Sequence, residues 1–198
     1  MLTRYTCWVF DLDGTLTVHQ HDFDAIRAAL DIPPGRLILE YINAQPRARA
    51  ARLHERLAAL ESELCASARA APGADTLLAL LRKQGHHRGI LTRSTRANAL
   101  ATLEAAGLAG YFAPGDVLGR DDAPPKPAAD GIEHLLGRWG GMPARGVMVG
   151  DFRLDLESGR RAGVATVHVN ADPHQQWPEL TDYRFATLGE LLAALTGA

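Results

Sequence analysis

Residues 5–15 of the chain read YTCWVFDLDGT. The run from 5 to 12 is short, apolar and rich in aromatic and β-branched residues, which is typical of a buried strand. It ends at Asp13-Gly14, a pair that favours a turn. Because alternate residues of a strand point to the same side, Asp11 and Asp13 should lie together where the strand ends. This stretch therefore predicts a buried strand that places two carboxylates at one edge of a sheet.

Similar strand patterns recur along the chain and alternate with helical patterns. The strand patterns lie at residues 88–91, 146–149 and 164–169. The helical patterns cover residues 75–84, 95–106, 127–138, 156–162 and 188–195, with Pro127 expected in the first turn of its helix. Strands and helices that alternate in this way form right-handed β-α-β units. We therefore expect a Rossmann-like three-layer α/β/α core with a parallel sheet.

Residues 17–71 break this alternation, because they contain no convincing strand pattern. Residues 24–30 have a helical pattern, the Pro-Pro-Gly of 33–35 interrupts it, and leucines then recur at helical spacing at Leu53, Leu57, Leu60 and Leu64. We expect residues 17–71 to form a small α-helical insertion after the first strand. The core would then consist of residues 1–16 and 72–198.

Composition limits the class of protein and its partners. The chain has 198 residues, 46% hydrophobic and 22% charged, which is ordinary for a soluble globular protein. Its net charge of −2 offers no basic field for nucleic acid or an anionic membrane. Cys7 and Cys65 match no metal-ligand spacing. The N-terminus does not resemble a signal peptide, and no apolar stretch approaches the roughly 20 residues that span a bilayer, so we expect a cytoplasmic protein.

Polar residues gather just after the expected strands. Asp11 and Asp13 follow the first, Thr92 follows the second, and Asp151 and Asp155 follow the third. In open parallel sheets, ligands bind beyond the carboxyl ends of the strands. Two nearby carboxylates repel each other unless a cation or a proton separates them, and Mg²⁺ prefers oxygen ligands. The pattern predicts a site that holds a divalent cation.

Asp-Leu-Asp-Gly-Thr after an apolar strand resembles the signature of the haloacid dehalogenase-like hydrolase superfamily. The resemblance implies that Asp11 attacks phosphorus and forms an aspartyl-phosphate. It also implies that Asp13 protonates the leaving oxygen, later deprotonates the attacking water, and contributes its carbonyl to Mg²⁺. By the same resemblance, Asp11, Leu12 and Asp13 would contact the phosphate.

The second and third motifs of this superfamily have counterparts here. Residues 89–92, Gly-Ile-Leu-Thr, match the second, which implies that Thr92 and the backbone N–H of Arg93 bind phosphoryl oxygens. Many relatives have Asn where this chain has Arg93. Lys126, which has prolines on both sides, matches the third motif and would bring its ammonium to the phosphate and to Asp11.

The fourth motif is Gly150-Asp151 followed by Asp155. The resemblance implies that Asp151 binds the metal, and that Asp155 orients metal-bound water or Lys126. A Ser or Thr commonly follows the first acid in relatives, whereas this chain has Phe152.

The insertion resembles the small helical cap of the phosphoglycolate phosphatase-like branch, which closes over the site and selects the substrate. Its candidate substrate-binding residues are His19, Arg47 and Arg49, since an arginine can bind a carboxylate or a second phosphate. The sequence itself does not name the substrate or the oligomeric state.

These patterns together predict a Mg²⁺-dependent phosphatase that acts on a small phosphorylated metabolite. One alternative with the same machinery is a phosphomutase acting on a sugar phosphate. Carbon–halogen hydrolysis is disfavoured because dehalogenating relatives lack the second acid, here Asp13. A non-catalytic module that only accepts phosphate is also disfavoured, because a scaffold has no use for a general acid.

Overall fold

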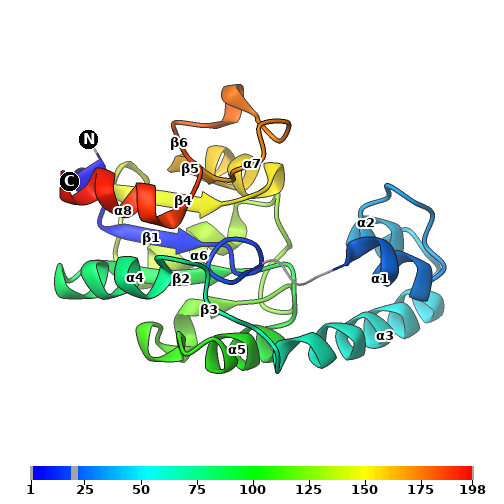
Figure 1. The fold of residues 1–198 in the computed structure, drawn as a ribbon. Helices are drawn as coiled ribbons and strands as arrows, with labels where there is room; N and C mark the ends of the chain where they lie inside the picture. Colours follow the sequence, from blue (N-terminus) through cyan, green and yellow to red (C-terminus); the bar gives the residue numbers. More distant parts are fainter. Residues whose placement is uncertain (1, 19–21, 198) are drawn as a thin grey trace.

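The computed structural model describes residues 2–18 and 22–197 (Figure 1). Within these residues, six parallel strands form one sheet in the order β3-β2-β1-β4-β5-β6. The strands are β1 (Cys7–Phe10), β2 (His87–Leu91), β3 (Val117–Leu118), β4 (Gly146–Gly150), β5 (Ala165–Val169) and β6 (Tyr183–Phe185). The predicted Rossmann-like α/β class is confirmed.

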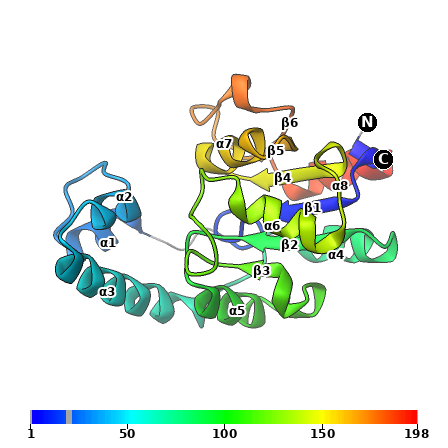
Figure 2. The same ribbon diagram turned by 180° about the vertical axis from the view of Figure 1, so that it is seen from behind.

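Helices cover both faces of the sheet, so β1 is buried on both sides. Trp8 and Phe10 point into the larger apolar cluster, with α4 (Ala74–Lys83), α5 (Arg96–Ala105) and α8 (Leu188–Thr196). Cys7 and Val9 point to the other face, which α6 (Asp130–Trp139) and α7 (Arg153–Arg161) cover (Figure 2). The alternation along β1 thus divides the core into two apolar layers.

Three helices form the helical insertion: α1 (Phe23–Ala29), α2 (Ile38–Asn43) and α3 (Arg47–Cys65). Their inner faces share an apolar cluster of their own, made of Ile26, Leu30, Ile32, Leu39, Ile42, Leu53 and Leu57. The two chain segments that lead to these helices pair with each other. Val18 N–H donates to the Arg69 carbonyl at 2.9 Å, and Ala71 N–H donates to the Leu16 carbonyl at 2.8 Å.

The structure differs from the predicted elements in several places. Strand β1 spans Cys7–Phe10 instead of residues 5–12. Strands β3 and β6 were not predicted. Helix α6 starts at Asp130 instead of residue 127, because the Pro127 and Ala128 carbonyls accept hydrogen bonds from side chains of α7. Helix α7 starts at Arg153 instead of residue 156, because the Asp155 carboxylate accepts the Phe152 N–H and closes an earlier turn.

Two other features concern the chain as a whole. Both cysteines are free and buried. Among the described helices, none has the length and hydropathy that a membrane span requires. The sheet places the carboxyl ends of β1, β2 and β4 side by side, so the segments that follow these strands meet at one edge.

Candidate active site

The segment after β1 forms a tight turn that fixes Asp11. Asp11 N–H donates to the Val149 carbonyl of β4 at 2.9 Å, which keeps Asp11 in the sheet. The Leu12 carbonyl then accepts the N–H groups of residues 16 and 17. Gly14 has a φ of 92°, a region that favours glycine. The chain therefore reverses within a few residues, and Thr15 comes to lie beside Asp151.

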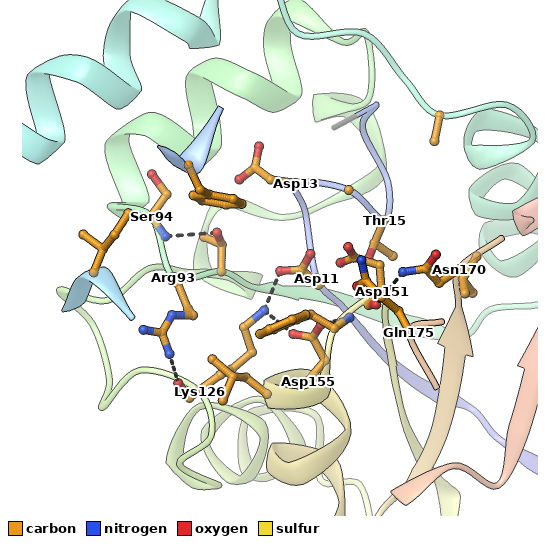
Figure 3. Close-up of a pocket in the computed structure, with 18 of the residues that line it drawn as sticks. Asp11, Asp13, Thr15, Arg93, Ser94, Lys126, Asp151, Asp155, Asn170 and Gln175 are labelled. Atoms are coloured by element: carbon orange, nitrogen blue, oxygen red, sulfur yellow. Dashed lines mark hydrogen bonds and ion pairs between the residues drawn. The ribbon is translucent and has the colours of Figure 1, made fainter. Parts of the chain in front are cut away.

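Lys126 lies between two carboxylates at the edge of the sheet (Figure 3). Its ammonium forms an ion pair with Asp11, and its Nζ lies 2.6 Å from Asp155 Oδ1. Lys126 is only 2% exposed, so this pairing is shielded from solvent. Asp155 is fixed in turn, because its Oδ2 accepts the Phe152 N–H at 3.0 Å.

Asp151 stands on the other side of Asp11. Its Oδ1 accepts a hydrogen bond from Thr15 Oγ1 at 3.2 Å. Its carbonyl accepts two more, from His168 Nε2 and Asn170 Nδ2, each at 3.1 Å. Sequence patterns alone did not identify His168 and Asn170 as supports, although His168 lies within the strand pattern at residues 164–169 and Asn170 directly follows it.

The acids of this cluster outnumber its one ammonium. Carboxylate oxygens of Asp11, Asp151 and Asp155 lie within 4.8 Å of one another. Burial, together with the charges of the other two, raises the pKa of Asp151 to about 8. Burial raises the pKa of Asp155 to about 6, and the Lys126 ammonium opposes that rise. A compact set of buried and half-buried oxygen donors with excess negative charge fits a hard divalent cation such as Mg²⁺.

Asp13 has a different environment from the other acids. Burial raises its pKa to about 6, and the negative charge of Glu61 contributes to the rise. A carboxyl group with this pKa can hold and release a proton near neutral pH. The environment that raises the pKa of Asp13 therefore includes Glu61 of α3, a residue of the helical insertion.

Thr92 follows β2 and begins a loop that reaches the helical insertion. Thr92 N–H donates to the Leu118 carbonyl at 3.0 Å, and Thr92 Oγ1 accepts the Ser94 N–H at 3.1 Å. Arg93 carries its guanidinium across to α2, where Nη2 lies 2.8 Å from Glu40 Oε2. The Arg93 side chain also donates to the Lys126 carbonyl. This loop thus links the core site to α2.

A second link joins the same loop to α3 through Glu61. Both oxygens of the Glu61 carboxylate lie 2.8 Å from Arg120 Nη1 and accept hydrogen bonds from it. Glu61 also accepts a hydrogen bond from Ser94 Oγ at 3.1 Å. Arg120 also donates to the Arg93 carbonyl at 2.9 Å. Glu61 is only 9% exposed, so the helical insertion contacts the core through a largely buried ion pair with Arg120, which follows β3.

Comparison with known families identifies the family of this chain. Residues 5–163 match the family model described as haloacid dehalogenase-like hydrolase. The chain belongs to the haloacid dehalogenase-like hydrolase family. The prediction of this superfamily and of a hydrolase is therefore confirmed.

Relatives of this haloacid dehalogenase-like hydrolase span most of its length. An uncharacterized hydrolase of Saccharomyces cerevisiae is 30% identical over 93% of this chain and 88% of its own. A phosphoglycolate phosphatase of Mesorhizobium japonicum is 30% identical over 82% of this chain and 81% of its own. A crystal structure of a hydrolase from Pseudomonas syringae has a TM-score of 0.81 at 24% identity, over 97% of this chain and 98% of that one, which supports the fold.

The structure brings most of the predicted residues of this hydrolase to one cavity of about 650 Å³. Its lining includes Asp11, Asp13, Thr92, Arg93, Lys126, Asp151 and Asp155. The Leu12 side chain is buried in the core instead. Arg47 and Arg49 are exposed at the start of α3 and do not line this cavity. His19 lies outside the described residues.

Proposed function

We propose that this hydrolase is a Mg²⁺-dependent phosphatase that cleaves a phosphate monoester through an aspartyl-phosphate on Asp11. The observation that carries the proposal is the buried pairing of Asp11 with Lys126 beside Asp13, in a cavity large enough for a substrate. The names of several relatives, including the phosphoglycolate phosphatase described above, support phosphate chemistry.

In the first step, an Asp11 carboxylate oxygen attacks phosphorus, and the bond from phosphorus to the leaving oxygen breaks. Asp13 gives its proton to that oxygen, so the product departs as an alcohol. The Lys126 ammonium offsets the negative charge on the phosphoryl oxygens. Thr92 and the backbone N–H of Arg93 bind these oxygens by hydrogen bonds. Lys126, which also pairs with Asp155, holds Asp11 in place before the reaction.

In the second step, water attacks the phosphorus of the aspartyl-phosphate. Asp13, now ionised, accepts a proton from that water, and the bond from phosphorus to Asp11 breaks. Inorganic phosphate leaves and Asp11 is regenerated. The side chains of Asp11 and Asp151 and the Asp13 carbonyl would hold Mg²⁺, which, when bound, neutralises charge on the phosphate and on the acids.

We further propose that residues 17–71 act as a cap over a catalytic core of residues 1–16 and 72–198. The paired segments around Val18 and Arg69 connect the two parts, which leaves a narrow hinge. Glu40 and Glu61 contact the loop after β2 from the cap side. Closure of such a cap would exclude water from the first step.

The test is phosphate release by the purified chain from a panel of phosphate monoesters. Activity should require Mg²⁺, disappear in EDTA, and be lost in Asp11→Asn while the circular dichroism spectrum stays unchanged. Full activity in EDTA, or in Asp11→Asn, would refute the proposal. A rearranged phosphate ester without free phosphate would replace the phosphatase with a phosphomutase.

A further inference from the structure

The cavity that contains the catalytic acids continues into an apolar compartment. Side chains from the helical insertion and from the core line this compartment, among them Ile26, Leu37, Ile38, Leu57, Phe152 and Leu154. Leu37 is 42% exposed and Phe152 is 41% exposed, although both are large and apolar. Large apolar side chains exposed inside a cavity mark a surface that binds apolar ligand atoms.

The cations that line the cavity in the described part of the chain already have anionic partners. Arg27 Nη1 lies 2.6 Å from Asp24 Oδ1. Arg93 is paired with Glu40, and Lys126 with two catalytic-site carboxylates. A second anionic group on a substrate would have to compete with one of these carboxylates for its cation.

The size of the cavity also fits a substrate that is larger than a phosphate group. At about 650 Å³ it falls within the roughly 300–1,000 Å³ of sites that hold drug-sized ligands. A phosphate group bound at Asp11 and Lys126 would fill only the polar end. The remaining space adjoins Leu37 and Phe152, and its walls come from both α2 and the segment before α7.

We propose that the leaving group of the substrate is uncharged and apolar, an alkyl or aryl group that lies against Leu37 and Phe152. The inference rests on the proposed phosphatase function and names its substrate class. It makes esters that carry a carboxylate or a second phosphate poorer substrates than apolar esters of similar length.

The first test compares primary alkyl phosphates, because their leaving alcohols have similar acidity. Each methylene that becomes fully buried should raise kcat/KM of the substrate about fourfold, the equivalent of ~0.8 kcal/mol. Partial burial of four added methylenes should therefore make hexyl phosphate about tenfold or more better than ethyl phosphate. Phosphoglycolate should be no better than ethyl phosphate. Equal values along the alkyl series, or a preference for phosphoglycolate, would overturn the inference.

A pair of leucine variants tests the assigned surface. Leu37→Ala should lower the hexyl-to-ethyl ratio of kcat/KM by about threefold or more, since it removes apolar area from the compartment. Leu100→Ala is the matched control, because Leu100 is 37% exposed on α5 and does not line the cavity. An unchanged ratio in Leu37→Ala, with circular dichroism showing both variants folded, would place the leaving group elsewhere.

A binding measurement separates this inference from the proposed function. Hexylphosphonate and ethylphosphonate carry the anionic group on a carbon–phosphorus bond that phosphatases of this kind do not cleave. Hexylphosphonate should raise the unfolding temperature more than ethylphosphonate at equal concentration. If no monoester is hydrolysed but this difference is found, the phosphatase proposal fails and the apolar site stands. If monoesters are hydrolysed without the difference, only the apolar site fails.

Discussion

Replacement of Lys126 by Met tests how the buried acids are held together. Met has a similar length but no charge, so Asp11 and Asp155 would lose their shared ammonium inside the protein. Removal of one partner from a buried ion pair costs about 3–5 kcal/mol. We expect the lower value, about 3 kcal/mol, because the two acids can reduce their repulsion by taking up a proton.

The assay is thermal and urea unfolding in EDTA. A loss of about 3 kcal/mol corresponds to a decrease of roughly 6–12 °C in Tm for a chain of this size. The matched control is Lys83→Met, since Lys83 is exposed at the end of α4 and is the other lysine of the chain. The control should change stability by no more than about 0.5 kcal/mol.

The Lys126 variant also has a clear refuting result. If Lys126→Met is as stable as the wild-type protein and binds no extra proton on folding, the ammonium does not compensate Asp11 and Asp155. The cluster would then need another source of positive charge, and the assignment of Lys126 to the site would be wrong.

Three further predictions follow from the site. Asp13→Asn should slow the hydrolysis of alkyl phosphates by about 100-fold or more, but that of p-nitrophenyl phosphate much less, because nitrophenolate leaves without a proton; equal losses would exclude a general acid role. The rise in Tm caused by Mg²⁺ should increase between pH 5.5 and 8.5. The pKa of Asp151 is raised to about 8, so the metal-free folded state loses stability as Asp151 gives up its proton over this range. A rise in Tm that shrinks as the pH increases would contradict this. Glu61→Gln should destabilise the protein by about 3 kcal/mol because Arg120 loses its buried partner, whereas Glu63→Gln, exposed on the same helix, should not; equal stability of the two variants in urea would refute the ion pair.

The centre of the sheet was predictable because β1 and β4 are wholly buried runs between turn signals, and β2 ends in three buried residues. The edge strands were not, since β3 has two residues and β6 has three, and β6 is only partly buried. Such short strands give no periodic pattern, and the pairing with β2 or β5 decides their conformation.

The acids at the strand ends were also predictable, because a parallel topology brings those ends together. The contact between Glu61 and Arg120 was not, since the two residues are 59 positions apart and meet only when α3 packs on the core. One signal was available in the spacing. Glu61 follows Leu53 and Leu57 at intervals of four, so it lies on the buried face of α3, where an acid needs a partner.

Trapping the phosphorylated enzyme tests the central claim, that Asp11 is the nucleophile, most directly. A single turnover with a phosphate monoester and Mg²⁺ is quenched in acid, and the peptides are analysed by mass spectrometry. The account predicts a hydroxylamine-sensitive phosphoryl group on the peptide that contains Asp11, and none in Asp11→Asn. A phosphoryl group on another residue, or rapid release of phosphate without any covalent intermediate, would contradict it.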